Sequence, residues 1–183
     1  MIINVHAGHN PAGKVACGAV SLLNESTCAR SIKNKLLTML RKSGYTVYDC
    51  TCSNGTSQSD VLAKIVKKCN AHNATLDISI HLNSARNDLK GDGKTGGVEV
   101  IIRKDSGDKI CKLAKQICKN ISEDLDITNR GVKSNTGLYV LNKTKAPALL
   151  IECCFVDDKD DQLKYNATKM ARAIADAVIQ IYG

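Results

Sequence analysis

The sequence predicts a single α/β domain with about six strands in a mostly parallel, mixed sheet and with helices on both faces. Short apolar segments alternate with amphipathic segments along most of the chain, which is typical of strands joined by helical crossovers. Several of the short segments are continuously apolar, as expected for strands that are covered on both sides. A length of 183 residues with 43% apolar residues suffices for one hydrophobic core, so we expect one domain.

The first half of the chain contains three predicted strands and two predicted helices. Asn24 is a suitable N-cap, and apolar residues recur at helical spacing after it until Gly44, a typical C-terminal residue of a helix. The segment 6–11 reads as a loop because it contains glycine and proline. The predicted strands are 2–5, 45–50 and 76–83, and the predicted helices are about 25–42 and a segment around 61–69.

The second half continues the alternation after a polar segment. Residues 84–96 are rich in Lys, Asp, Asn and Gly and are expected to form a mobile surface loop. Asn129–Gly131 reads as a turn. The remaining predicted strands are 97–103, 138–141 and 148–151, and the remaining predicted helices are about 106–124 and 167–182. The order of the strands in the sheet does not follow from the sequence.

The formal charge of +8 comes mostly from dispersed lysines and suits a solvated surface or attraction to a polyanion. The chain has no Arg-rich helix and no alternation of basic and aromatic residues, so an acidic cell-wall polymer is favoured over nucleic acid. Aromatic residues make up 3% of the chain and tryptophan is absent, which excludes the stacking of sugars on tryptophan.

The cysteines indicate a reduced protein made in the cytoplasm. Their number, nine, is odd, and no paired CxxC spacing occurs, so we expect free thiols on apolar positions. The N-terminus lacks the pattern of a signal peptide, and no apolar run is long enough to cross a membrane. Any export therefore requires another route.

Four polar side chains are expected at one edge of the sheet, since sites of open α/β sheets gather at the carboxyl ends of strands. His9 follows the first strand, and His81 lies near the end of the third. Glu152 ends the last apolar strand, and Glu25 begins the first helix. Two imidazoles and one carboxylate are a ligand set for catalytic zinc with a position open for water, and the other carboxylate can act as the base.

Three of these residues also have a structural interpretation. His81, taken alone, fits a hydrogen-bonded histidine in the core, Glu25 fits the positive N-terminus of a helix, and Glu152 fits an ion pair with a lysine. His6 competes with His9 but lies within or close to the strand, so we interpret it as a supporting or structural residue. Glu99 is a weaker candidate for the site.

Six segments, in this order, resemble the zinc-dependent N-acetylmuramoyl-L-alanine amidases of the amidase type 3 family, which occur as catalytic domains of phage endolysins and bacterial autolysins. The segments are Ala7–Asn10, Asn24–Ser26, Ile78–Asn83, Gly97–Val100, Arg130–Lys133 and Pro147–Phe155. The resemblance covers essentially the whole chain. It departs from the family pattern at residues 10–13, where the family has a glycine-rich segment, and at Cys153–Cys154, where the family has small residues.

The resemblance implies one Zn²⁺ per chain, with His9, Glu25 and His81 as ligands and Glu152 as the catalytic residue. It implies a fold like that of zinc exopeptidases and phosphorylase/hydrolase enzymes, with residues 1–183 as the catalytic domain. The reaction is hydrolysis of the amide bond between N-acetylmuramic acid and L-alanine in peptidoglycan, which lyses the cell wall. Substrate-binding residues are not identified, although Asn83, two residues after His81, is an expected orienting residue.

The resemblance further implies synthesis in the cytoplasm and action at the bacterial wall after passage through a membrane lesion. The expected partner is peptidoglycan, together with anionic wall polymers, without nucleic acid and without insertion into the membrane. Two alternatives remain. A zinc carboxypeptidase-like enzyme acting on wall peptides would use similar ligands, and a non-catalytic wall-binding module would explain the basic surface.

Overall fold

The computed structural model describes residues 1–183 and has a six-stranded sheet at its centre, with the strand order β2-β1-β3-β6-β4-β5. β4 is antiparallel to β6, and the other neighbouring pairs are parallel. The predicted mostly parallel, mixed sheet is therefore confirmed. The strands are β1 Ile2–Ala7, β2 Thr46–Asp49, β3 Leu76–Asn83, β4 Val98–Ile102, β5 Asn129–Ser134 and β6 Ala148–Phe155.

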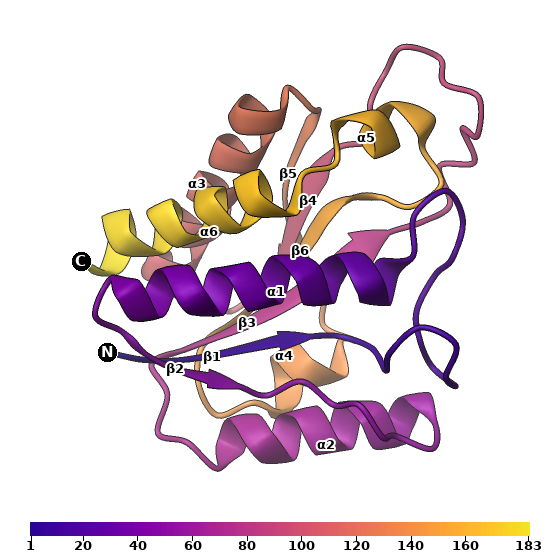
Figure 1. The fold of residues 1–183 in the computed structure, drawn as a ribbon. Coiled ribbons are helices and arrows are strands. Elements are labelled where there is room, and N and C mark those ends of the chain that lie inside the picture. The colour runs from indigo at the N-terminus through magenta and orange to yellow at the C-terminus, as the bar shows by residue number, and fades with distance from the viewer.

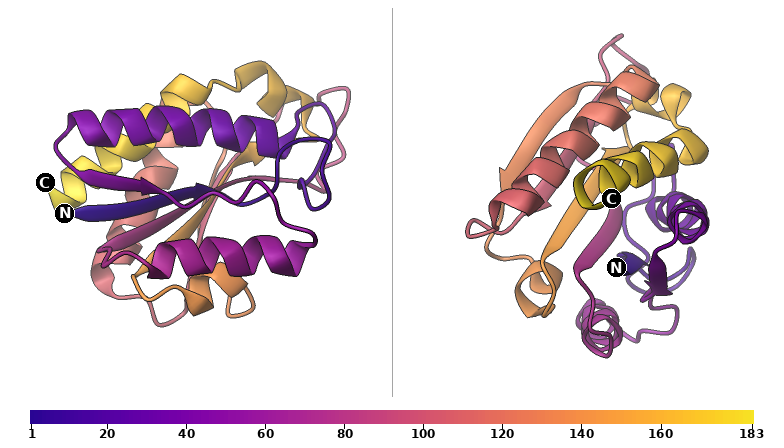
Figure 2. Two further views of the ribbon diagram at one scale, coloured as in Figure 1. Left: turned by 60° about the horizontal axis from the view of Figure 1, so that its bottom comes forward. Right: turned by 90° about the vertical axis from the view of Figure 1, so that its left-hand side faces the viewer.

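Helices cover both faces of this sheet, as predicted (Figures 1 and 2). α1, α3 and α6 lie on one face, and α2 and α4 lie on the other (Figure 1). None of the helices is both long and apolar enough to cross a membrane. The helices are α1 Glu25–Lys42, α2 Gln58–Asn70, α3 Asp108–Leu125, α4 Tyr139–Lys143, α5 Lys159–Lys164 and α6 Ala167–Tyr182.

The main hydrophobic core fills the space between the sheet and α1, α3 and α6. Alternate strand residues such as Val5, Ile80 and Ile151 are fully buried there. A smaller cluster lies under α2 and includes Ile65 and Val140. All nine cysteines are free thiols; seven are buried in these two clusters, and Cys17 and Cys111 are partly exposed.

The α2 face of β1 and β3 is polar although it is buried. Asn4, His6, Asp77 and Ser79 are each at most 1% exposed. Asn4 Nδ2 donates to Asp77 Oδ1 at 2.6 Å, whereas Asp77 Oδ2 has no hydrogen-bond partner. Burial raises the pKa of Asp77 to about 6, because the charged carboxylate loses its hydration. The two strands therefore carry a polar layer that continues toward His81 at the end of β3.

Two predicted segments differ from the structure. Residues 129–131 begin strand β5 rather than forming a turn, and residues 139–141 lie in helix α4 rather than in a strand. β5 is an edge strand with an exposed, polar sequence, so it lacks the apolar signal of the other strands. A short apolar run such as 138–141 fits a strand and a buried helical turn equally well.

Candidate metal centre

The carboxyl ends of β1, β3 and β6 meet at one edge of the sheet, as the sequence predicts. His81 on β3 and Glu152 on β6 occupy paired positions of these neighbouring strands. His9 follows β1 directly, and the long connection from β1 to α1 returns Glu25 to the same edge. The structure thus brings all four predicted residues to one region, although their roles stay predictions.

Glu25 is positioned by the start of α1. Asn24 caps the helix, since its side chain accepts a hydrogen bond from the backbone N–H of Thr27 at 3.0 Å. Backbone N–H groups then hold the carboxylate of Glu25. Ala19 donates to Oε2 at 2.9 Å, and Leu82 donates to Oε1 at 3.3 Å. The side chain of Glu25 is 6% exposed, and its carboxylate points to the end of β3 rather than into solvent.

Both imidazoles converge on the same oxygen of Glu25. Oε1 lies 3.1 Å from Nε2 of His9 and 3.0 Å from Nδ1 of His81. The two rings are 4.9 Å apart, edge to face, at an angle of 82°. One ligand atom from each of the three residues lies within 4.8 Å of the others. Two imidazole nitrogens and a carboxylate oxygen at this spacing can hold one metal ion.

The backbone around this cluster has glycine where a side chain would collide with it. A Cβ on Gly8 would lie 1.8 Å from Cε1 of His81, and a Cβ on Gly18 would lie 2.4 Å from Oε2 of Glu25. Gly18 also has a φ of +78°, which other residues adopt at a cost. The side chains of His81 and Glu25 are therefore packed directly against main chain.

The loop that carries His9 is fixed by polar side chains outside the cluster. Arg30 of α1 donates from Nη2 to the backbone oxygen of His9 at 2.8 Å. Asn10, which is fully buried, both donates to and accepts from the backbone of Gly55. His6, interpreted from the sequence as supporting or structural, is fully buried, and its Nδ1 lies 3.5 Å from the hydroxyl of Ser79. Burial lowers the pKa of His6 to about 3, so this imidazole is neutral.

The electrostatics of the cluster suit a bound cation. Burial acts to raise the pKa of Glu25, but hydrogen bonds with His81 and His9 outweigh it and hold the pKa well below its usual range. Burial also lowers the pKa of His81, against the opposing effect of Glu25. A permanently charged carboxylate next to an imidazole that resists protonation leaves negative charge for a metal ion to neutralise.

Glu152 lies beside this cluster and has an oxygen without a partner. Its Oε2 is buried and makes no hydrogen bond. Burial first, and then the charges of Glu25 and Glu99, raise the pKa of Glu152 to about 8. A buried carboxylate oxygen without a partner is rare unless it has a chemical task, and Glu152 is paired across the sheet with His81, one of the three converging residues.

Two residues of this edge were underrated or missed by the sequence analysis. Glu99 on β4 is paired with Glu152 on β6, so the two side chains share one face of the sheet. Arg130 of β5 donates from Nε to Oε2 of Glu99 at 2.8 Å, and Asn83 donates from Nδ2 to Oε1 at 3.0 Å. Because β4 and β5 run opposite to β6, the first residues of these two strands, and not their last, lie at this edge. Glu99 and Arg130 are therefore found near the starts of β4 and β5.

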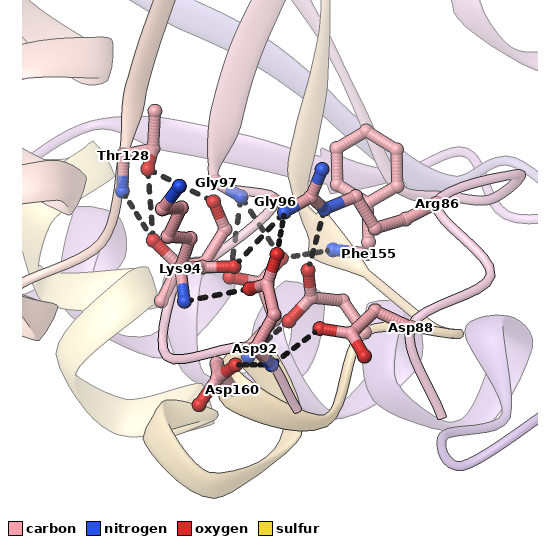
Figure 3. Close-up of polar contacts among 12 residues, drawn as sticks. Arg86, Asp88, Asp92, Lys94, Gly96, Gly97, Thr128, Phe155 and Asp160 are labelled. Carbon is pink, nitrogen blue, oxygen red and sulfur yellow. Dashed lines mark hydrogen bonds and ion pairs between the residues drawn. The ribbon is translucent and has the colours of Figure 1, made fainter. Parts of the chain in front are cut away.

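The predicted surface loop between β3 and β4 is fastened to the segment after β6. Arg86 donates from Nε to Asp158 at 3.0 Å, and Asp160 accepts from the backbone of Asp92 and Gly93 (Figure 3). Asp88, Asp158 and Asp160 form a second group of close carboxylates. The backbone N–H groups and the arginine of the loop already donate to their oxygens, so this group serves to hold the loop.

Comparisons with known proteins agree with this arrangement. The model of the Amidase_3 family, described as N-acetylmuramoyl-L-alanine amidase, matches residues 1–181. An uncharacterized 38.4 kDa protein of Clostridium perfringens is 37% identical over 161 residues, which are 88% of this chain and 45% of that protein. N-acetylmuramoyl-L-alanine amidase LytC of Bacillus subtilis (strain 168) is 30% identical over 134 residues, which are 71% of this chain and 26% of LytC.

Solved structures show the same fold. The catalytic domain of the CD27L endolysin targeting Clostridia Difficile superposes with a TM-score of 0.84 at 28% identity, over 98% of this chain and 97% of that one. N-acetylmuramoyl-L-alanine amidase AmiC2 of Nostoc punctiforme superposes with a TM-score of 0.78 at 26% identity, over 98% and 96% of the two chains. The chain spans about half the length of the two Clostridium perfringens relatives it matches, 45% and 47%.

Proposed function

The chain belongs to the N-acetylmuramoyl-L-alanine amidase family Amidase_3, and from this premise we propose that residues 1–183 are a catalytic domain that hydrolyses the amide bond between N-acetylmuramic acid and L-alanine in peptidoglycan. One observation carries the proposal. His9, Glu25 and His81 converge within 4.8 Å of one another, next to the buried and unpartnered Oε2 of Glu152.

The metal in this proposal is one Zn²⁺ ion, held by His9, Glu25 and His81. The donor set fits zinc, because two imidazoles and one carboxylate leave a coordination position open for chemistry. The geometry supports this fit, since without a cation each imidazole must place a proton on the nitrogen that faces Glu25. Zinc in such a set supplies Lewis-acid polarisation of a carbonyl and acidifies water to a pKa of about 7.

Glu152 is the proposed general base and acid. Because its Oε2 makes no hydrogen bond to the protein, the carboxylate is free to take a proton from the attacking water and to return that proton to the leaving nitrogen of L-alanine. Such proton transfer contributes about 10²- to 10⁴-fold to the rate. Glu25 cannot share this role, because its two oxygens already accept hydrogen bonds from Ala19 and Leu82 and face the imidazoles.

The place of action in this proposal is the bacterial cell wall, with peptidoglycan as the substrate. Support comes from the family and from the formal charge of +8, which suits approach to anionic wall polymers. The proposal includes neither nucleic acid as a partner nor insertion into a membrane. Synthesis in the cytoplasm and passage through a membrane lesion complete it.

The test is to compare Glu152→Gln with Glu123→Gln, which changes an exposed carboxylate on α3 in the same way. Purified peptidoglycan is the substrate, and the readouts are zinc per chain and released peptides. We expect Glu152→Gln to keep its zinc and to lose at least about 10²-fold in the rate of peptide release, while Glu123→Gln behaves as wild type. Near-normal release by Glu152→Gln would show that Glu152 is not the base.

The products identify the reaction. An amidase frees alanine amino termini and creates no new reducing ends of sugars. A carboxypeptidase-like enzyme would instead release single amino acids, and a wall-binding module would bind the wall and release nothing. Either of these two outcomes would refute the amidase proposal.

A further inference from the structure

We propose that Arg130 binds a carboxylate group of the substrate's peptide, on the side that leaves after cleavage. The inference rests on the proposed amidase function. Four observations lead to it: a bulge that directs Arg130 to the site, contacts that fix its guanidinium group, hydrogen-bond donors that stay open, and its place in the row of side chains that includes Glu152.

A β-bulge directs the side chain of Arg130. Val98 on β4 pairs with Asn129 on β5, but the next residue, Glu99, pairs with Gly131. Arg130 is therefore an extra residue on the bulged strand. Gly131 accommodates the bulge with a φ of +76°. Bulges near active sites re-aim a side chain, and here the bulged residue contacts Glu99 on the face that carries Glu152.

The guanidinium group of Arg130 is held from three sides. Its Nε donates to Oε2 of Glu99 at 2.8 Å, and its Nη1 donates to the backbone oxygen of Gly96 at 3.4 Å. Its Cζ lies 5.0 Å from the centre of the Phe155 ring. Gly96 and Phe155 lie close together (Figure 3), and a Cβ on Gly96 would come within 2.6 Å of this ring. Asn83 in turn holds the other oxygen of Glu99.

This support leaves one edge of the guanidinium group open. Nη2 of Arg130 makes no hydrogen bond to the protein, and the side chain is 38% exposed while that of Glu99 is 12% exposed. Arg103, at the other end of β4, is different, because its Nε and Nη2 both donate to Asp105. A fixed guanidinium with free N–H groups is a ready receptor for a carboxylate.

The position of Arg130 matches the path of a peptide. His81, Glu152 and Glu99 occupy paired positions on the successive strands β3, β6 and β4, with Arg130 on β5 beyond them. Neighbouring strands are roughly 4.8 Å apart, and an extended peptide advances roughly 3.3–3.6 Å per residue. A peptide whose first amide lies between the ligands and Glu152 would therefore bring its second or third residue to Arg130.

The distribution of charge also favours a peptide that runs from Glu152 toward Arg130. Glu25, Glu99 and Glu152 bring three carboxyl groups to this edge of the sheet, so an anionic peptide needs a cation to bind there. Arg130 is the cation in contact with the row, and Glu99 fixes its geometry through one N–H group. In this arrangement, Glu99 and Asn83 are positioning residues that act through Arg130, and Arg130 is the residue that touches the substrate.

Binding of peptides to the zinc-loaded protein tests the proposal without the need for turnover. Three synthetic peptides start with L-alanine and differ in one group: a free carboxylate on the second residue, a free carboxylate on the third residue, or carboxamides at both. Wild type, Arg130→Gln and Arg130→Lys are compared by calorimetry. Arg103→Gln is the control, because it removes a paired arginine far from the row.

We expect wild type to prefer one carboxylate peptide to the peptide with carboxamides by at least about tenfold in Kd, the effect of a charge-assisted hydrogen bond. Arg130→Gln should abolish this preference, Arg130→Lys should keep part of it, and Arg103→Gln should leave it unchanged. Equal affinities of wild type for all three peptides, or an equal loss for all three in Arg130→Gln, would overturn the proposal.

The corresponding muramoyl peptides separate this inference from the proposed function. If wild type cleaves them, Arg130→Gln should raise KM for the preferred carboxylate substrate by about the same factor and leave kcat nearly unchanged. If the preference in binding holds but no muramoyl peptide is cleaved, the amidase proposal fails while Arg130 remains a carboxylate-binding residue. If cleavage occurs and the preference is absent, only the role of Arg130 is refuted.

Discussion

Replacing Gly8 by alanine should weaken metal binding and leave the fold intact. The added Cβ would lie 1.8 Å from Cε1 and 1.9 Å from Nε2 of His81, whereas real Cβ atoms essentially never approach within 3.0 Å. The imidazole must therefore retreat by about 1.2 Å, the shortfall between 1.8 and 3.0 Å. Gly8 does not have a positive φ, so the backbone itself accepts alanine without strain.

A displacement of this size is large for a metal ligand. Ligand distances in metal sites hold to within about 0.2 Å, and the replacement of residues that only support ligands typically costs 10- to 100-fold in metal affinity. The ring of His81 is also held by Glu25 at 3.0 Å, a contact that the same displacement would break. We therefore expect the zinc affinity of Gly8→Ala to fall by at least about tenfold, or about 1.4 kcal/mol.

The assay is competition for zinc against a chromophoric chelator, with far-ultraviolet circular dichroism as a check of folding. Gly107→Ala is the matched control, because a Cβ there meets nothing within 4 Å and its φ of −67° suits alanine. It should bind zinc as wild type does. If Gly8→Ala is folded and also binds zinc with wild-type affinity, then His81 does not hold the metal in the position seen here.

Two further predictions concern stability and salt. The pKa of Asp77 is raised to about 6 in the folded state, so the stability it contributes is complete below its ordinary pKa of 3.8 and is lost as pH rises through 6. In urea unfolding, Asp77→Asn should therefore be about 1–3 kcal/mol more stable than wild type at pH 8 and should lose this advantage near pH 4. The control, Asp176→Asn, changes an exposed carboxylate and should have the stability of wild type at both pH values. A stability advantage of Asp77→Asn that does not depend on pH would contradict burial of the charge as its cause. Because the net charge is +8, the rate of peptide release from whole walls should fall as salt rises from low to physiological concentration, and a flat rate would exclude electrostatic attraction to the wall.

The positions of His9, Glu25, His81 and Glu152 could be predicted because each residue lies close to an end of a predicted strand or helix, although β6 continues beyond Glu152 to Phe155. Parallel strands that start at one edge must end at the other, so their last residues meet there. The resemblance to the family's sequence motifs indicated the same four residues independently. The convergence of two imidazoles on one oxygen of Glu25 follows only from the coordinates, because it depends on the long loop after β1.

Glu99 and Arg130 could not be placed in the same way. The rule of carboxyl ends applies to parallel strands, and β4 is antiparallel to β6, so the start of β4 rather than its end lies at the site. Asn129–Gly131 has the composition of a turn, and the bulge with its positive φ at Gly131 is the physical reason for that composition. The predicted number of six strands was correct, although one strand was assigned to residues of α4 and β5 was missed.

The free thiols described above make this protein a natural subject for chemical footprinting. All but Cys17 and Cys111 are buried, and they occupy separate layers, with Cys50, Cys52 and Cys69 under α2 and others in the main core. A thiol reagent can modify a buried cysteine only when its surroundings open. The unaltered chain thus reports, residue by residue in a mass spectrometer, which side of the sheet opens first and whether bound metal slows that opening.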